Sequence, residues 1–579
     1  MSKIRINTIS VKNYRSFGNE IQSFEFPNES YKKPVAIVGY NNSGKTNLMN
    51  AILYGIGEKF VSADTFEKSD LHNLKYENIL EIKTNLDASS YSTAYGNKSI
   101  KGVHTVLTKM EDSELHSNVS PSFFGANKHY NIFYINFHNI KEEISTQKTS
   151  WGNLKSFLAR HIQKLVESDS SMNSKKLAFQ VATRTETDKI LENSELKKFI
   201  DTIKKNYSVN LRENTCEIDF GLPDYEDIFL KMMFKIGLNG ECEHLVPIDH
   251  FGDGYISMFV MAVIQAIAES NTEDKCLFLF EEPESFLHEN HQEYFYKNVL
   301  CTLSERGHQV IYTTHSDKMV DIFNTKSLIR IEFDEEKKQT VKRYNNTGEF
   351  SPILDSREET EELITLEKYN DFIRTIEPNL NKILFSRKVI LVEGPNDVMA
   401  YKYAIEKQIE KLGKDQKYAK THLNFNNMAI IPHHGKSTAL ILIQLCKHIG
   451  LNYFVINDLD LEEDLVDAIS KFNTEAELKA DDLYNTKNGI NRDPTSKSII
   501  TINWKLIHYA RKDKIHFNSP KLETVLGGSF NKNSLKLWKM LEAKDSFEED
   551  FFPSSLKEFL EFDKIIVESS EPSSNTIIS

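Results

Sequence analysis

Eight consecutive residues, Gly39 to Thr46, carry the clearest chemistry of the chain, because they fit the pattern G-x-x-x-x-G-K-[ST] at every fixed position. The glycines of such a P-loop let backbone N–H groups curl around phosphates, and a helix that starts there adds positive potential. Lys45 would reach the β- and γ-phosphates, and the Thr46 hydroxyl would ligate Mg²⁺. The pattern therefore predicts a nucleotide site. Its predicted binding residues are Gly39, Asn41, Asn42, Ser43, Gly44, Lys45, Thr46 and Asn47.

In the last third of the chain, four carboxylates follow apolar runs: Glu393 and Asp397 follow one run, and Asp458 and Asp460 follow another. Carboxylate oxygens are the ligands that Mg²⁺ and Mn²⁺ prefer. Two such ions close together activate water and stabilise the leaving oxygen of a phosphodiester. Two unrelated acidic turns would be a simpler explanation, but both pairs stand at the ends of predicted strands. The sequence therefore predicts a two-metal site in which all four side chains are metal ligands and catalytic residues.

The elements that must position the P-loop follow from apolar spacing. The run Val35–Val38 is uninterrupted and predicts a buried strand, whereas Leu48, Met49 and Ile52 recur at helical spacing. A strand, the motif and a helix in this order form the context that supports nucleotide binding.

The elements that must position the four carboxylates are strands alternating with helices. Apolar runs at Val389–Val392, Ala429–Ile431 and Tyr453–Ile456 predict strands, with helices between them at Val398–Lys411 and Thr438–Ile449. Strand–helix–strand alternation predicts a parallel α/β sheet, whose ligands bind at the carboxyl ends of the strands. All four carboxylates fall at those ends.

Two further strands end at residues that could complete a nucleotide site. Cys276–Phe280 predicts a buried strand followed by Glu281 and Glu282, whose carboxylates could hold Mg²⁺ and polarise an attacking water. Gln309–Thr314 predicts another strand, followed by His315.

Gly252 and Gly254 precede an apolar helix predicted from about Met258 to Ala268, and the segment Asn13–Phe17 precedes the P-loop. The order of these motifs resembles ATPases of the ABC superfamily, in the branch of chromosome-maintenance and recombination ATPases. In that family the glycines belong to a signature that meets the γ-phosphate of a partner subunit's nucleotide. The resemblance implies ATP as the nucleotide and a homodimer or a higher even assembly. Arg15 would lie either near the phosphates or on a solvated turn.

The same resemblance implies roles for the residues after the two strands. Glu281 replaces the usual aspartate that binds Mg²⁺, and Glu282 is the expected general base and therefore a catalytic residue. His315 matches the switch histidine that contacts the γ-phosphate. Because the signature lacks a clear L-S-G-G-Q and Glu281 stands for aspartate, ATP turnover could be slow, with the nucleotide acting as a sensor.

Between about Lys141 and Val209 the sequence becomes polar, with apolar residues such as Leu154, Phe157 and Leu158 at helical spacing. This texture predicts a helical insertion in which heptads are not sustained. The insertion is either a dimerisation element or a simple helical excursion.

The strand ends of the C-terminal third resemble those of a Toprim domain, found in topoisomerases, primases and certain nucleases. Glu-x-x-x-Asp followed by Asp-x-Asp fits the nuclease branch. In related domains a Gly-Lys pair lies beside the site, so Lys436 contacts DNA phosphate or, as we expect, is a surface lysine. The resemblance also implies a late lysine at the scissile phosphate, and Lys532 is the candidate for this catalytic role.

An ABC-type ATPase with a helical insertion, followed by this Toprim domain, resembles the OLD (overcoming lysogenisation defect) family. The resemblance implies an α/β protein that binds ATP and Mg²⁺ (or Mn²⁺) and nicks or cleaves DNA under the control of its ATPase. It also implies bacterial defence against phage, alone or with an operon-encoded partner such as a helicase or a retron reverse transcriptase with its RNA–DNA product. The competing hypotheses are an ATP-driven clamp that binds DNA without cutting it, and a primase or topoisomerase.

The formal net charge of −13 indicates that nucleic acid must meet a local basic groove or metal ions rather than a uniformly basic surface. Scattered cysteines argue against a disulfide framework or a zinc site. Without a membrane-length apolar stretch or a signal-peptide core, we expect a cytoplasmic protein that contacts no membrane. The predicted domains are the ATPase at 1–140 and 216–350, the helical insertion at 141–215, a linker at 351–385 and the Toprim domain at 386–579.

Overall fold

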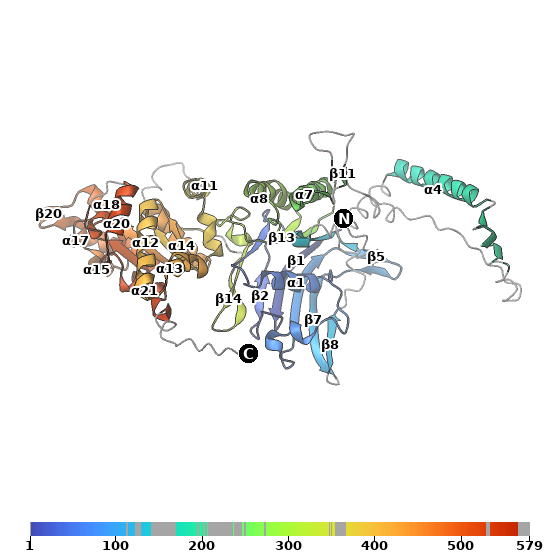
Figure 1. Cartoon of the computed structure of the whole chain (residues 1–579), viewed down its shortest axis with the longest axis horizontal. Coiled ribbons are helices and arrows are strands. Elements are labelled where there is room, and N and C mark those ends of the chain that lie inside the picture. Colours follow the sequence, from blue (N-terminus) through green and yellow to red (C-terminus); the bar gives the residue numbers. More distant parts are fainter. Residues whose placement is uncertain are drawn as a thin grey trace. The chain divides into compact units, whose positions relative to one another are not determined.

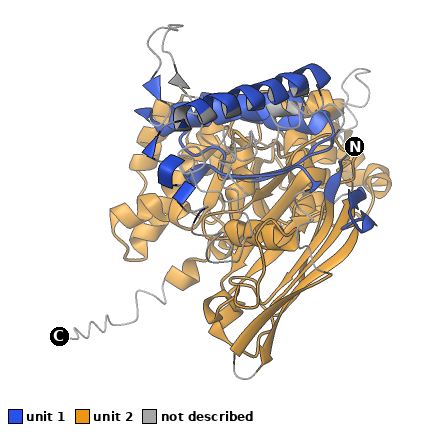
Figure 2. Cartoon of the chain, turned by 90° about the vertical axis from the view of Figure 1, so that its right-hand side faces the viewer, with its two compact units in different colours: residues 1–5, 88–100, 125–312 blue, residues 6–87, 101–124, 313–579 orange. Residues whose placement is uncertain are grey.

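The chain divides into two compact units, each assembled from separate stretches of sequence (Figure 2). Unit 1 comprises residues 1–5, 88–100 and 125–312, and unit 2 comprises residues 6–87, 101–124 and 313–579. The computed structural model describes residues 2–111, 114–121, 129–139, 169–192, 250–270, 274–346, 350–353, 366–528 and 533–565, together with residue 348 and short pieces within 194–205 and 235–247. No helix in these ranges has the length and apolar character needed to span a membrane. The predicted domain boundaries remain predictions.

Unit 2 begins with a five-stranded sheet of order β2-β1-β4-β7-β8, in which the β1–β2, β4–β7 and β7–β8 pairs are antiparallel (Figure 1). Buried and partly exposed residues alternate along β4, so this strand buries one face of the sheet against the core. The strands are β1 (Ile4–Lys12), β2 (Gln22–Glu25), β4 (Glu81–Ala88), β7 (Gly102–Glu111) and β8 (Glu114–Ser120).

The P-loop lies in unit 2 between strand β3 (Val35–Val38) and helix α1 (Lys45–Gly55). All four residues of β3 are buried, as their apolar run predicts. Strand β14 (Leu328–Asp334) pairs in parallel with β3, and β15 (Gln339–Asn345) pairs antiparallel with β14. The predicted strand, loop and helix are confirmed.

Unit 1 contains strand β9 (Ile132–Asn136), which pairs in parallel with β12 (Leu277–Glu281). The helix predicted from about Met258 starts earlier: α7 spans Asp253–Ser270, because Gly254 and the residues after it are already helical. The first residue of β13 (Gln309–Thr313) donates its N–H to the Cys276 carbonyl. The described residues of unit 1 also form η4 (Phe137–Asn139), α4 (Ser170–Leu191), α8 (Glu289–Phe295), the π-helix η7 (Tyr296–Cys301) and α9 (Thr302–Glu305).

The C-terminal part of unit 2 is a four-stranded sheet of order β17-β16-β18-β21 in which every neighbouring pair is parallel. Helices between the strands pack against it (Figure 1). The sequence predicted the first three strands but missed β21, which is short and carries the polar residues His516 and Asn518. The elements are β16 (Lys388–Val392), α12 (Pro395–Lys411), α13 (Gln416–Phe425), β17 (Met428–Pro432), α14 (Lys436–His448), β18 (Asn452–Asp458), α18 (Pro494–Ala510) and β21 (Ile515–Asn518).

Within unit 2, a buried arginine connects the P-loop side to this parallel sheet. Arg330 of β14 is 1% exposed and forms an ion pair with Glu332. It also donates to the Ser386 carbonyl at 3.0 Å and the Gly450 carbonyl at 3.4 Å. Arg343 approaches the other Glu332 oxygen at 2.8 Å but is 39% exposed. Glu332 therefore depends chiefly on Arg330 for a partner away from water.

Replacing Arg330 by methionine should destabilise the protein by about 3–5 kcal/mol, because it removes the buried partner of Glu332 and leaves only the more exposed Arg343. Arg343→Met, which removes an equal charge from the same carboxylate at an exposed position, should cost about 1 kcal/mol or less. Urea unfolding followed by circular dichroism would measure both. Equal losses in the two variants would show that Arg330 is not the principal partner of Glu332.

Candidate functional site

Two parallel neighbours of the C-terminal sheet bring the predicted carboxylates to one edge. Glu393 directly follows β16, and Asp458 is the last residue of β18, which pairs with β16. The backbone N–H of Asp458 donates to Glu393 Oε2 at 3.1 Å. Asp397 lies in the first turn of α12, where its Oδ2 accepts the Gly394 N–H at 3.1 Å. The sequence spacing thus becomes a spatial cluster through parallel strand pairing.

Asp458 is held by groups that no sequence motif identified. Its Oδ1 accepts the Leu522 N–H at 2.9 Å and Asn518 Nδ2 at 3.3 Å. The Tyr401 hydroxyl donates to Asn518 Oδ1 at 2.8 Å, and neither Asn518 nor Tyr401 is exposed. This relay fixes the Asp458 carboxylate from the fourth strand and from α12.

The negative charge of these carboxylates is unfavourable in the buried cluster, and their pKa values are raised accordingly. Burial, followed by the charge of Glu393, raises the pKa of Asp397 to about 7 and that of Asp458 to about 8. Burial also raises the pKa of Glu393. Glu523 adds to this effect by raising the pKa of Glu393 and Asp397, and the sequence motifs did not reveal it. At neutral pH the cluster binds protons that a divalent cation would displace.

Lys436 and Asp460 form an ion pair at the same edge. Lys436 Nζ lies 2.7 Å from Asp460 Oδ2, and it donates to the Leu459 carbonyl at 3.3 Å. The Lys436 side chain is only 11% exposed. Lys436 begins α14 directly after Gly435, whose φ of +139° favours glycine. The expectation that Lys436 is a surface lysine is therefore wrong.

The donor set fits a hydrated divalent cation better than a closed metal cage. Across the described ranges, no three acidic, histidine or cysteine side chains converge closely enough to hold a metal by themselves. Two of the carboxylates are engaged elsewhere, because Asp460 pairs with Lys436 and one Asp397 oxygen caps the start of α12. Mg²⁺ usually keeps several waters and takes only one or two carboxylates. Asp397 Oδ1 is buried without a hydrogen-bond partner in this part of the chain, which fits a cation or its water.

Neighbouring atoms pack so closely against the P-loop backbone that Gly39 and Gly44 have no room for a side chain. A Cβ on Gly39 would come within 2.3 Å of the Ile331 carbonyl oxygen, and one on Gly44 within 2.3 Å of Thr340 Oγ1. Gly44 also has a φ of +100°. Lys45 is buried, and its Nζ donates to the carbonyls of Gly39 (2.9 Å) and Tyr40 (3.1 Å).

Side chains outside the motif support the P-loop within unit 2. Thr340 Oγ1 lies 3.0 Å from the Ser43 carbonyl and 2.8 Å from Ser16 Oγ. Asn47 Nδ2 donates to the same Ser16 oxygen at 2.8 Å. Thr46 is exposed, so its hydroxyl is accessible to a ligand. The sequence motif did not identify Thr340, which lies on β15.

Two other residues of unit 2 were singled out by the ABC resemblance. His315 is half-buried just beyond β13, where the Thr314 N–H donates to the carbonyl of Ile37 in β3 at 3.3 Å. Arg15 pairs with Asp70 at 2.9 Å and is 39% exposed. Asp70 therefore holds the Arg15 side chain.

In unit 1, the two glutamates at the end of β12 have different partners. Glu281 is buried, and its Oε2 accepts Tyr134 Oη at 2.7 Å and Asn136 Nδ2 at 3.2 Å. Glu282 has a φ of +47°, and its Oε2 lies 2.6 Å from His138 Nε2. None of these three partners, Tyr134 and Asn136 on β9 and His138 just after it, was predicted from the sequence.

Gly252 and Gly254 lie at the start of α7 in unit 1. Gly252 is exposed, and a Cβ on it would meet no atom, whereas a Cβ on Gly254 would lie 3.1 Å from the Phe286 carbonyl oxygen. Two predictions fall outside the described residues: the catalytic Lys532 and the apolar helix around Leu154.

The raised carboxyl pKa values predict how the stability of the metal-free protein depends on pH. Folded Asp458 keeps its proton up to about pH 8, whereas an unfolded aspartate loses it near pH 4, so stability falls as pH rises between these values. Asp458→Asn should remove this fall. In EDTA at pH 8.5, its Tm should exceed that of the wild type by at least about 3 °C, and the difference should vanish near pH 4.5.

Differential scanning fluorimetry across this pH range would measure the effect. Asp415→Asn is the matched control, because the exposed Asp415 caps α13 and asparagine caps equally well. A wild type and an Asp458→Asn variant with parallel pH profiles would contradict the raised pKa.

Comparisons with known proteins match the nucleotide site to ATPase domains and the carboxylate cluster to a Toprim domain. Residues 384–460 match the family model described as "Overcoming lysogenization defect protein-like, TOPRIM domain". Residues 147–320 match the model of an AAA ATPase domain, and residues 8–231 match that of an AAA domain.

Curated relatives align with most of the chain. The "OLD nuclease" of Thermus scotoductus is 22% identical over 96% of this chain and 98% of its own length. The "Old nuclease" of Escherichia phage P2 is 25% identical over 79% of this chain and 77% of its own. The "Endonuclease GajA" of Bacillus cereus is 21% identical over 70% of this chain and 68% of its own. The chain thus combines a segment that matches an AAA ATPase domain with a segment that matches an OLD-like Toprim domain, and most of its length is similar to proteins named OLD nuclease.

Proposed function

We propose that this protein is a divalent-metal-dependent DNA endonuclease whose Toprim site is controlled by its ATPase domain, and that it acts in bacterial defence against phage. The observation that carries the nuclease proposal is the buried carboxylate cluster at the ends of two parallel strands, with its raised pKa values and the unpartnered Asp397 Oδ1. The printed names of the relatives, two OLD nucleases and the endonuclease GajA, support the same activity.

In this proposal, Glu393, Asp397, Asp458 and Asp460 hold Mg²⁺ or Mn²⁺. The bound ions supply an activated water and positive charge for the leaving oxygen of the phosphodiester. The relay from Tyr401 through Asn518 orients Asp458 Oδ1, and the other Asp458 oxygen would be the one that holds the cation. Lys532 remains the proposed lysine at the scissile phosphate.

Lys436 would play a second part beside the metal site. Its ammonium group occupies the acidic edge through the ion pair with Asp460. When cations neutralise the carboxylates, the lysine can turn to a phosphate oxygen of the DNA strand, because a phosphate competes well for an ammonium group. Lys436 is therefore a proposed DNA contact.

In the ATPase domain, Gly39, Asn41, Asn42, Ser43, Gly44, Lys45 and Asn47 would hold the phosphates of ATP, and Thr46 and Glu281 would hold Mg²⁺. Glu282 is the proposed general base, and its contact with His138 would orient or restrain it. His315 would contact the γ-phosphate. Gly252 and Gly254 would meet the nucleotide of a second subunit, which makes a homodimer or a higher even assembly the proposed state. A helicase or a retron reverse transcriptase remains a proposed partner.

Contacts within unit 2 supply a physical route for control by ATP. After His315, the carbonyls of Asp317 and Val320 accept both hydrogens of Asn381 Nδ2, each at 2.9 Å. Near Asn381, Glu377 Oε2 lies 3.2 Å from His434 Nε2. His434 precedes Lys436 by two residues, so the route ends beside Asp460.

Asp458→Asn should lower nicking of supercoiled plasmid by about 100-fold or more, because loss of a metal ligand removes several kcal/mol of transition-state stabilisation. Agarose gels with Mg²⁺ or Mn²⁺, and with EDTA as the metal-free arm, would measure this. Asp415→Asn should cut like the wild type. If no form cuts DNA while all bind it, the protein is an ATP-dependent clamp or requires a partner, and co-purification from the native operon would separate these outcomes.

Lys45→Ala should abolish the effect of ATP on cutting while leaving cutting without ATP nearly unchanged, because the substitution removes the cation that reaches the β- and γ-phosphates. Plasmid cleavage at increasing ATP concentration would show this as a flat response. Lys33→Ala removes an exposed lysine just before β3 and should respond like the wild type. If Lys45→Ala still responds to ATP, the P-loop is not the regulatory site.

A further inference from the structure

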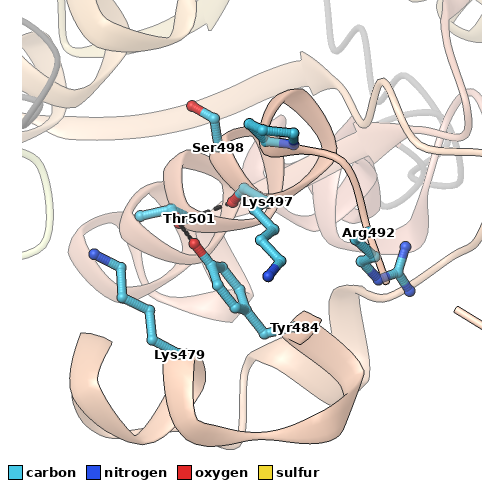
Figure 3. Close-up of a pocket in the computed structure, with 7 residues that line it drawn as sticks. Lys479, Tyr484, Arg492, Lys497, Ser498 and Thr501 are labelled. Atoms are coloured by element: carbon cyan, nitrogen blue, oxygen red, sulfur yellow. Dashed lines mark hydrogen bonds between the residues drawn. The ribbon is translucent and has the colours of Figure 1, made fainter. Parts of the chain in front are cut away.

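A pocket of about 350 Å³ lies in the Toprim part of unit 2, apart from the carboxylate cluster. It is formed by α16 (Glu475–Ala480), α17 (Asp482–Asn485) and the start of α18. Figure 3 shows basic side chains from separate elements around the ring of Tyr484. The pocket is lined by Lys479, Tyr484, Arg492, Lys497, Ser498 and Thr501, among others.

The lining of this pocket combines cations with hydroxyl groups and contains no carboxylate. Lys479 and Arg492 have acidic partners, Glu475 and Glu463, but neither glutamate lines the pocket. Lys497 Nζ donates to the neutral Asn485 Oδ1 at 3.0 Å and lies 5.6 Å from the centre of the Tyr484 ring. A carboxylate would repel an anion here, whereas these groups offer donors and positive charge to one.

Hydroxyl groups are already arranged around the cations. Thr501 Oγ1 donates to the Lys497 carbonyl at 2.9 Å and lies 3.3 Å from Tyr484 Oη, and both hydroxyls belong to the wall of the pocket. Thr501 is spaced one helical turn from Lys497, and Ser498 lies on the turn between them, so α18 presents one lysine and two hydroxyls on neighbouring positions. Ser, Thr and Tyr hydroxyls together with Lys and Arg are the side chains that contact phosphate oxygens in nucleic-acid complexes.

Arg492 gives the pocket a fixed wall. Its side chain is 6% exposed. Its Nε donates to the Leu483 carbonyl at 2.8 Å, and its Nη2 donates to Glu463 Oε2 at 2.9 Å. These bonds hold the loop before α18 against α17 without any ligand, so the site requires little reordering when an anion enters.

The same helix connects the pocket to the predicted cleavage site. Asn503 of α18 is fully buried and donates to the Leu459 carbonyl, between Asp458 and Asp460, at 2.8 Å. Glu463, which holds Arg492, follows Asp460 by three residues. Lys497 and Asn503 are separated by about 9 Å along the helix axis at 1.5 Å per residue. A group bound in the pocket would therefore be held at a fixed, short distance from the carboxylates.

We propose that this pocket binds a backbone phosphate of the DNA strand, a few nucleotides from the bond that the Toprim carboxylates cleave. The proposal rests on the proposed nuclease function for the choice of DNA. A chain with a net charge of −13 needs local cationic sites to hold a polyanion in register, and phosphate contacts set register without reading sequence.

The test is DNA binding by the full-length protein in EDTA, where no cutting occurs. A fluorescein-labelled duplex and a single strand of about 30 nucleotides would be titrated by anisotropy at several salt concentrations. The double variant Lys479→Met/Lys497→Met keeps the apolar stems of both side chains. It should bind about 10-fold more weakly near 0.1 M salt, with a log–log salt slope smaller by about 1 to 2. Lys512→Met, an exposed lysine in the same domain, is the matched control.

A double variant that matches Lys512→Met in both affinity and salt slope overturns the proposal. Inorganic phosphate provides a second arm, because the same donors could hold a free anion. If phosphate raises the Tm of the wild type but not of the double variant while DNA affinity is equal in both, the pocket binds only free anions, and the assignment to DNA fails. Since binding is measured without metal, weakened binding by the double variant supports the pocket even if the wild type cuts no DNA, which would refute only the nuclease function.

Discussion

The burial of several carboxylates at one edge of the Toprim sheet, together with the repulsion among them, constrains the groups around that edge. Parallel pairing of β16 with β18 places Glu393 beside the backbone of Asp458, and the first turn of α12 adds Asp397. Burial removes much of the water that would otherwise stabilise three negative charges, so the pKa of Asp397 rises to about 7 and that of Asp458 to about 8. The fold can keep this edge at neutral pH only with protons or with cations.

The neighbouring groups supply hydrogen-bond donors or positive charge to some of these carboxylate oxygens and not to others. Asp458 Oδ1 receives the Leu522 N–H and the Asn518 amide, and Asp460 receives the Lys436 ammonium. Asp397 Oδ1 is buried and receives no donor from the described part of the chain. Because an unsatisfied buried oxygen costs free energy, this atom is where a hydrated cation would stabilise the folded protein most. The outer contacts thus fix the shape of the site, and the deficit at Asp397 favours a metal.

The sequence predicted the parts of each site that depend on neighbours along the chain. The P-loop between β3 and α1, and the carboxylates after β16 and β18, follow from local spacing and strand ends. The supporting residues were not predictable in this way, because tertiary pairing brings them in from far along the chain. Tyr401 and Asn518 are 117 residues apart, and Thr340 and Ser43 are 297 apart. No local period or motif marks such a pair.

Lys436 shows a different limit of sequence reasoning. A lysine after a glycine turn is usually solvated, and only the packing of α14 against β18 turns it toward Asp460. The basic pocket of α16 to α18 has the same origin, since its cations are dispersed among acidic residues of the sequence and only the fold gathers them on one wall. Charge counts along the chain average over such surfaces, which is why a net acidic protein can still present a cationic site.

Two sets of contacts join the P-loop side of unit 2 to the Toprim sheet, and they differ in what they can transmit. Arg330, opposite Val38 of the P-loop strand, binds the Ser386 carbonyl just before β16, so it anchors the buried sheet. The second set leads to a turn. Asn381 binds the Asp317 carbonyl just after His315, and Glu377 contacts His434 in the turn that precedes Lys436. A packed core resists small displacements, whereas a turn can change the partner of one exposed carboxylate such as Asp460 at low cost. Control of cutting by nucleotide is therefore expected to act on the Lys436–Asp460 pair rather than on the strands that carry Glu393 and Asp458.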